Sequence, residues 1–347
     1  MDYSIQKLIL LLLPLLIFSK ELESSDATPA FTTQYAKPYI TSEKSKFGAH
    51  IEGASVNWKG EVFATSFDTD NSLLNSIGKI TTPQEIFFRD DSIKTHFNGV
   101  RFRSNKEAFA ADVSGHRVVK MNIDKNGNVS KTENFCSNST MIQPNDIAIT
   151  SDGVIFTSGS QFAATTTNQS GDIWVCEAGK PARLLLLLGM TNGIEISKDN
   201  DYLFVSESYY NNSISTSQKI WKFKINSDYS LTNKELFYDF QKNLKTSKLA
   251  DIDGMRIDVK GNLYVTRNGD GEVIVLNSKG QLTSKIILNF SNPTNLEFGG
   301  FNGRELYIVG RCGMDTPFGE GKGCVDRLNV TYQGRAFSNI QSAFFIH

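Results

Sequence analysis

Six segments of the chain begin with a residue whose side chain carries an oxygen suited to binding a cation. Carboxylate and carboxamide oxygens are the ligands of a hard cation such as Ca²⁺, at about 2.3–2.6 Å. Cysteine and histidine are absent from these positions, which argues against copper and against a zinc–thiolate site. A local interpretation also exists, because Asn and Asp at strand starts make Asx turns. The matched position in every segment favours the ligand interpretation for the set, here called the lead residues: Glu52, Asn98, Asn145, Asn192, Asp253 and Asn295.

The repeated segment after each lead residue must position it. Each repeat has alternating apolar residues, a turn and a second strand, as in MRIDVKGNLYV from Met255. Successive lead residues lie 46, 47, 47, 61 and 42 residues apart. A period of about 40 to 50 residues built from hairpins is typical of β-propeller blades. We therefore predict an all-β fold, a single-domain six-bladed β-propeller over residues 46–347, with a β-sandwich as the alternative. In a propeller the lead residues would converge near the central channel.

The N-terminus has the pattern of an export signal. Lys7 precedes an apolar run from Leu8 to Phe18, which as a helix would rise only about 16 Å, short of the roughly 30 Å hydrocarbon core. We predict a signal peptide over residues 1–20, with cleavage between residues 19 and 30, and no stable membrane anchor. Residues 21–45 are polar and are expected to form a mobile lead-in or a closing strand. The protein is expected to be secreted.

Sequons and cysteines agree with the secretory route. The four cysteines allow three pairings, and their spacing fits no zinc template. We expect a disulfide between Cys312 and Cys324, which close a Gly-rich loop, and another between Cys136 and Cys176. The N-x-[ST] sequons are predicted glycosylation sites at Asn128, Asn138, Asn168, Asn211, Asn289 and Asn329.

Composition excludes several functions. Lys and Arg total 36 against 37 Asp and Glu, so the net charge of −1 lacks the basic excess of a nucleic-acid-binding protein. The 24 Phe and 27 Gly residues suit short strands and tight turns. No G-x-S-x-G, P-loop or H-E-x-x-H motif occurs, so serine hydrolase, nucleotide-binding and zinc protease functions have no motif support.

The segments around four lead residues resemble the SMP-30/gluconolactonase superfamily of six-bladed propellers, with paraoxonases and diisopropyl-fluorophosphatase as more distant relatives. EGASVNW from Glu52 resembles the family's E-G-P-x-W, with Ala54 replacing Pro. PNDIAITSDG from Pro144 resembles its P-N-D segment, and NGIEISKDNDYLFVSES from Asn192 its N-G-x-x-x-S-x-D segment. DGMRIDVKGNLYV from Asp253 resembles D-G-M-x-x-D-x-x-G-N-L. The resemblance covers about residues 45 to 335.

By this resemblance, Ca²⁺ or another divalent cation would be held by Glu52, Asn145, Asn192 and Asp253. Asp253 and Asn98 are the expected catalytic residues, and Asn98 stands where some paraoxonase relatives carry a catalytic His. Asn98 and Gln143 are the expected substrate contacts. Sugar-lactone enzymes of the group carry an Arg at the position of Gln143, so a polyhydroxylated, gluconolactone-like substrate is not expected.

These observations predict a secreted calcium-dependent hydrolase of the lactonase or esterase type. Its partner would be a small-molecule lactone or related ester, whose carbonyl the metal would polarise in the central channel. The alternative is a non-catalytic secreted propeller in which the metal is structural and the loops bind a partner or ligand. A protein-interaction propeller resembling NHL-repeat arrays is a third hypothesis, but it gives no reason for Glu52.

Overall fold

The computed structural model describes residues 31–67, 75–91, 95–244, 247, 250–312 and 321–345. All of them fall in the compact unit of residues 31–347. The predicted signal peptide, its cleavage region and the first part of the predicted lead-in lie outside the described residues. None of the helices in the described ranges has the length and apolar character needed to cross a membrane.

The strands form up-and-down antiparallel meanders that follow one another along the chain. The first contains β3 (Phe47–Val56), β4 (Val62–Phe67), β5 (Ser76–Lys79) and β6 (Glu85–Arg89). The second contains β7 (Phe97–Phe102), β8 (Glu107–Asp112), β9 (Arg117–Ile123) and β10 (Val129–Ser137). The third contains β11 (Pro144–Ile149), β12 (Ile155–Ser160), β13 (Gly171–Cys176) and β14 (Arg183–Leu188).

The later meanders use the same plan. The fourth contains β15 (Ile194–Ile196), β16 (Tyr202–Asn211), β17 (Ile214–Ile225) and β18 (Leu231–Asp239). The fifth contains β19 (Asp251–Ile257), β20 (Leu263–Asn268), β21 (Glu272–Leu276) and β22 (Leu282–Ile287). The last contains β23 (Asn292–Gly299), β24 (Glu305–Cys312) and β25 (Lys322–Asn329). The extra length between Asn192 and Asp253 lies largely in β16 and β17, which have 10 and 12 residues.

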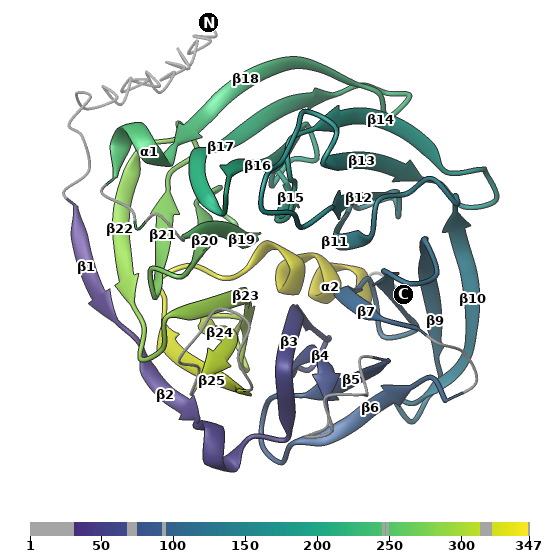
Figure 1. The fold of residues 1–347 in the computed structure, drawn as a ribbon. Helices are drawn as coiled ribbons and strands as arrows, with labels where there is room; N and C mark the ends of the chain where they lie inside the picture. Colours follow the sequence, from purple (N-terminus) through teal and green to yellow (C-terminus); the bar gives the residue numbers. More distant parts are fainter. Residues whose placement is uncertain are drawn as a thin grey trace, which may run out of the picture. The chain divides into compact units, whose positions relative to one another are not determined.

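Two strands come from the second part of the predicted lead-in. β1 (Thr32–Tyr35) pairs in parallel with β22, and β2 (Lys37–Ile40) pairs antiparallel with β25. The start of the chain thus supplies the outer strand beside β25. The last meander also joins the first, through the pair Lys322 and Gly48. Figure 1 shows the meanders of residues 31–347 arranged around a common centre, with the first strand of each meander innermost.

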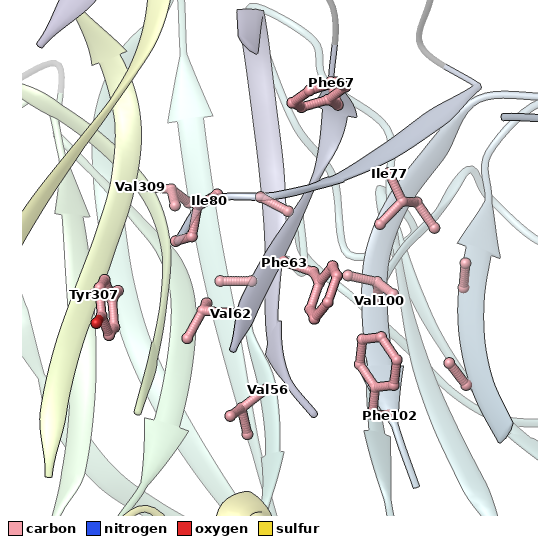
Figure 2. Close-up of a cluster of buried hydrophobic side chains, with 14 of the residues drawn as sticks. Val56, Val62, Phe63, Phe67, Ile77, Ile80, Val100, Phe102, Tyr307 and Val309 are labelled. Carbon is pink, nitrogen blue, oxygen red and sulfur yellow. The ribbon is translucent and has the colours of Figure 1, made fainter. Parts of the chain in front are cut away.

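Successive side chains of a strand point to opposite faces of its sheet, so apolar residues on both faces form the core between neighbouring meanders. Val62 and Phe63, successive residues of β4, point to opposite faces, and both are buried. Phe63 lies against Phe102 of β7, with ring centroids 4.9 Å apart, while Val62 lies on the side of Tyr307 of β24 (Figure 2). The apolar residues predicted from the repeats therefore form the contacts between sheets.

Helices occupy few residues, namely a 3₁₀ turn (Ser42–Lys44), α1 (Phe240–Asn243) and α2 (Arg335–Phe345). The sequence predicts no helix for the residues of α2, which lie within the range 46–347 assigned to the propeller. Phe337 and Ile340 pack into the core cluster of the first meander, and Gln341 donates to the carbonyl of Trp58. Arg335 Nη2 donates to Asn200 Oδ1 at 2.6 Å. α2 thus binds the turns that follow innermost strands, at the end away from the lead residues.

Candidate metal centre and active site

The structure places the lead residues on or beside the innermost strands. Asn192 precedes β15 by two residues, and the other lead residues lie within their strands: Glu52 on β3, Asn98 on β7, Asn145 on β11, Asp253 on β19 and Asn295 on β23.

Each lead residue lies at an irregularity of strand pairing. On β19, Ile252 pairs with Arg267 and Met255 pairs with Val265, so Asp253 and Gly254 together face one residue of β20. Register shifts also occur at the lead residues of β3, β7, β11 and β23. Around Asn192, Met190 pairs with Ser208 and Ile194 pairs with Val205. Three residues lie between these pairs in the segment of Asn192, but only two lie between them on β16. Such bulges bend a strand and re-aim its side chains.

Glycines after the lead residues bring neighbouring innermost strands close together. A Cβ on Gly53 would lie 2.0 Å from the carbonyl oxygen of Asn98, and one on Gly99 would lie 2.8 Å from that of Asn145. A Cβ on Gly193 would lie 2.2 Å from the carbonyl oxygen of Asp253, and one on Gly254 would lie 2.5 Å from the side chain of Asn295. Only glycine permits these approaches.

Two hydroxyl groups complete the circuit of contacts. Ser158 Oγ donates to the carbonyl of Asn192 at 2.5 Å and links the third meander to the fourth. Thr294 Oγ1 donates to the carbonyl of Ile51 at 2.6 Å and links the last meander to the first. Contacts therefore run from each lead position to the next and back to the start. We call the six lead residues in this arrangement the lead ring.

Glu52 and Asp253 interact electrostatically across the lead ring. The pKa of Asp253 is raised to about 8, chiefly by burial. A hydrogen bond from Asn268 Nδ2 to Asp253 Oδ2 at 2.9 Å opposes this rise, and the charge of Asp251 contributes to it. Loss of hydration and the charge of Asp253 raise the pKa of Glu52 well above its usual value. Arg311 lowers the pKa of both carboxyls. Within the described ranges neither forms an ion pair with a Lys, Arg or His.

The oxygens of the lead ring fit a hard cation. The side chains of Asn98, Asn145 and Asn192 make no hydrogen bond with any described residue, so their amide oxygens are available. Asn295 differs, because its Oδ1 accepts from Leu296 N and its Nδ2 donates to Asp146. In the described part of the chain, no three His, Cys, Asp or Glu side chains gather to hold a metal. A cation in the lead ring would thus need amide oxygens beside the two carboxylates.

A second group of buried charges lies one to three residues further along the innermost strands. Asp146 Oδ1 lies 3.0 Å from Arg101 Nη2, and its Oδ2 lies 3.4 Å from Arg256 Nη1. Arg256 Nε lies 3.1 Å from Glu297 Oε2. Burial opposes ionisation of Asp146, but the two guanidinium groups lower its pKa below the usual value. We call Arg101, Asp146, Arg256 and Glu297 the paired layer.

The remaining predicted site residues lie at the edges of this region. Gln143 is exposed, two residues before Asn145, and has a positive φ of 40°. Sequence reasoning missed Asp251 and Asn268, which flank Asp253 from the same strand and from β20. Asp251 Oδ1 accepts from Ser208 Oγ at 2.7 Å. The D-x-D spacing of β19 was an available signal for Asp251, whereas Asn268 is identified by strand pairing.

Both expected disulfides are present. Cys312 is bonded to Cys324, and Cys136 is bonded to Cys176. The first fixes the end of β24, which carries Arg311, to β25. The second joins β10 to β13 and thus the second meander to the third.

The sequons differ in their surroundings. Asn289 Nδ2 donates to Asp326 Oδ2 at 3.0 Å and to the carbonyl of Ala36 at 3.1 Å. A glycan would replace one of the two hydrogens on this nitrogen, so the two hydrogen bonds could not both form. Asn138 is partly buried, and the other sequon residues, Asn289 among them, are exposed: Asn128, Asn168, Asn211, Asn289 and Asn329.

Comparison with known families identifies a match over most of the chain. Residues 91–310 match the family described as the SMP-30/gluconolactonase/LRE-like region. A gluconolactonase of Zymomonas mobilis is 25% identical over 221 residues, which cover 61% of this chain and 60% of the relative. An uncharacterized protein of Sulfolobus acidocaldarius is 30% identical over 129 residues, covering 37% of this chain and 42% of that protein. The match thus spans about three fifths of the Zymomonas protein.

Solved structures show the same fold at low sequence identity. A luciferin-regenerating enzyme superposes with a TM-score of 0.66 and 16% identity, over 86% of this chain and 97% of that one. Regucalcin of Agrobacterium tumefaciens, described as a calcium-binding protein, gives 0.65 and 15%, over 87% and 97%. A gluconolactonase of Xanthomonas campestris gives 0.60 and 17%, over 87% and 99%. These similarities show an all-β propeller fold and nothing about chemistry.

Proposed function

The chain belongs to the SMP-30/gluconolactonase/LRE-like family, and from this premise we propose that it is a calcium-dependent hydrolase of lactones or related esters. We place the reaction at the lead ring, in the central channel. The meanders would be the blades of a single six-bladed propeller, with β2 completing the last blade. Two of the similar proteins are named gluconolactonases. That this chain also acts on a lactone or ester is our proposal.

One observation carries the proposal. Glu52 and Asp253 are carboxyls that face each other's charge in a desolvated place, and their raised pKa values mark an ionised pair that is unfavourable by itself. A divalent cation would make the ionised pair favourable. Asn145 and Asn192 are both buried, and their side chains form no hydrogen bond with a described residue, so they would add neutral oxygens.

The chain's own groups suit ring opening by water. A bound calcium ion would supply Lewis acidity that polarises the lactone carbonyl. Asp253 would take a proton from the water that attacks the carbonyl carbon, through Oδ1, because Asn268 donates to Oδ2. When the ring C–O bond breaks, this proton passes to the ring oxygen, and the product is the hydroxy acid. Asn98 and Gln143 would contact the substrate beside the ring.

A panel of lactones and aryl esters tests the proposal. We expect hydrolysis of at least one lactone with Ca²⁺, its loss with EDTA, and recovery when excess Ca²⁺ is added. Calorimetric titration with Ca²⁺ should give one site per chain. Tight calcium binding without turnover of any lactone or ester would contradict the enzymatic function and favour a structural metal in a propeller that binds a partner.

We also propose that the protein is secreted and glycosylated at exposed sequons. The short apolar run after Lys7 and the two disulfides support this route. Peptide mapping of protein from its native host should find the chain processed between residues 19 and 30. Glycans are expected on the exposed residues Asn128 and Asn329, which lie at strand ends away from the lead ring, while Asn289 stays unmodified. An intact N-terminus in that material would contradict secretion.

A further inference from the structure

The longest hairpin of the chain, β16–β17, is bonded to the connection between β12 and β13. Tyr210 N donates to Thr166 Oγ1 at 2.9 Å, and Thr166 N donates to the carbonyl of Tyr210 at 3.1 Å. Ser213 N donates to the carbonyl of Ala164 at 2.7 Å. The two segments therefore form one continuous wall shared by the third and fourth meanders.

This wall rises from the lead-ring end of the molecule. Gly159, near the end of β12, pairs with Pro144, the neighbour of Asn145. Ser160 N donates to the carbonyl of Gln143 at 3.3 Å. The wall starts at Ser160 and so stands beside the ligand candidate Asn145 and the substrate-contact candidate Gln143.

The wall carries apolar side chains and lacks charge. Phe162 is 60% exposed and Ile214 is 46% exposed. Both lie within two residues of the hydrogen bond between Ala164 and Ser213, so their backbones lie near each other. Residues 161–170 and 209–218 contain no Asp, Glu, Lys or Arg, although charged residues make up 21% of the chain. Together Phe162 and Ile214 form what we call the crest.

Two exposed apolar side chains in uncharged surroundings beside the proposed reactive site are suited to contact an apolar part of a ligand. Exposed apolar surface that is grouped and lies next to a binding site often contacts a ligand. Gln143 and the uncharged wall offer no cation for an acidic or strongly polar substituent. The crest is continuous with the lead ring through Ser160 and Gln143, so a substrate held at the ring would extend its substituent along the wall.

We propose that the crest binds an apolar substituent of the substrate, and hence that this chain hydrolyses lactones or esters that carry an alkyl or aryl group. The inference rests on the proposed function and specifies its substrate class. Phe162 and Ile214 determine specificity and take no part in the bond-breaking step.

A series of γ-lactones that carry hydrogen, methyl, propyl or hexyl on the ring tests the inference. Full burial of a methylene group is worth about fourfold in binding, and on an open wall we expect about twofold per methylene in kcat/KM. The hexyl lactone should therefore exceed the unsubstituted one by more than tenfold. Phe162→Ser and Ile214→Ser should each lower this hexyl-to-hydrogen ratio by about threefold, and the double variant by more.

Phe301→Ser is the matched control. Phe301 is 98% exposed, but it lies in the turn between β23 and β24, at the opposite end from the lead ring. The control should keep the wild-type ratio. An equal ratio in wild type and in the double variant would overturn the inference. A second result would also overturn it: co-sedimentation with vesicles that depends on Phe162, together with a kcat/KM that does not change across the lactone series. The crest would then bind lipid.

Failure of the proposed function has a different signature. If no lactone is hydrolysed, calorimetric binding of the hexyl and unsubstituted lactones still tests the crest. Tighter binding of the hexyl lactone that is reduced by Phe162→Ser supports it, and equal binding of the two lactones overturns it.

Discussion

The lead ring and the paired layer lie next to each other on the same innermost strands, yet they treat buried charge in opposite ways. In the paired layer, Asp146 contacts two guanidinium groups, and its pKa is lowered. In the lead ring, Asp253 receives one amide hydrogen bond, from Asn268, and its pKa is raised. The paired layer is balanced by its own residues. In the lead ring, Arg311 offsets only part of the loss of hydration, so the two carboxyls favour protons or an external cation.

The difference separates a structural role from a functional one. Buried charges that are fully paired fix the geometry of a fold, and removing one partner leaves an uncompensated charge. Buried carboxyls without a cation lower stability and are kept where they bind something. A shift of one to three residues along one strand thus changes the role of a charged side chain.

The largest effect is expected from Asp253→Asn. Removing the proposed base should lower lactone turnover about 10³-fold, and removing one negative charge should weaken Ca²⁺ binding. Stability in EDTA should not fall, because the amide cannot take on the unfavourable buried charge. Turnover, calorimetric Ca²⁺ affinity and chemical denaturation are the three measurements. Wild-type turnover and affinity would show that the site lies elsewhere.

Asp146→Asn is the matched variant in the paired layer. It leaves the guanidinium groups of Arg101 and Arg256 without their shared carboxylate, which should cost about 3 kcal/mol of unfolding free energy. Chemical denaturation measures this loss, and it should persist in saturating Ca²⁺. If Asp146→Asn is as stable as wild type, the contrast between the two layers is wrong.

Calcium should stabilise the protein, by about 2.7 kcal/mol at a hundredfold excess over Kd. Without calcium, folded Asp253 keeps its proton up to a pKa of about 8, while the unfolded chain loses it near the usual value of 3.8. The free energy of unfolding of the calcium-free protein should therefore fall as pH rises across this range.

The ionised pair binds the cation, so the stabilisation by Ca²⁺ should be larger at pH 8.5 than at pH 5. Thermal denaturation with Ca²⁺ and with EDTA at both pH values measures this difference. A stabilisation that does not change with pH would contradict the assignment of Glu52 and Asp253.

The smallest effect is expected from Asn98→Ala. Asn98 is a proposed substrate contact and lies outside the proposed ligand set, so kcat/KM should fall about tenfold, as for one lost hydrogen bond to substrate. Ca²⁺ affinity should stay within about twofold of wild type. Calorimetry and steady-state kinetics on one preparation separate the two quantities. Loss of Ca²⁺ binding would place Asn98 among the ligands.

Sequence alone predicts the propeller fold and the membership of the lead ring, because both depend on the repeat. The alternation in β19 and the recurrence of Asn or Asp before Gly are local and periodic. The short Gly-rich loop favours a disulfide between Cys312 and Cys324 among three possible pairings, and the structure has it.

The missed residues depend on contacts across strands. Asn268 donates to Asp253 only because a bulge at Asp253 and Gly254 sets the register against β20. Arg256 appears as one polar residue of an alternating strand, and its buried partners Asp146 and Glu297 belong to other meanders. α2 lies outside the repeats and could not be predicted from them. It packs against the core cluster of the first meander through Phe337 and Ile340.

The strands β1 and β2 also have a consequence for the order of folding. Ala36, between them, accepts a hydrogen bond from Asn289, 253 residues away. The earliest described segment therefore stays without its partners until almost the entire chain has been made. Contacts of such long sequence separation slow folding, and they protect the nascent chain from completing its ring early. Under the proposed secretion, this late closing step would come after the unfolded chain has passed through the translocation channel.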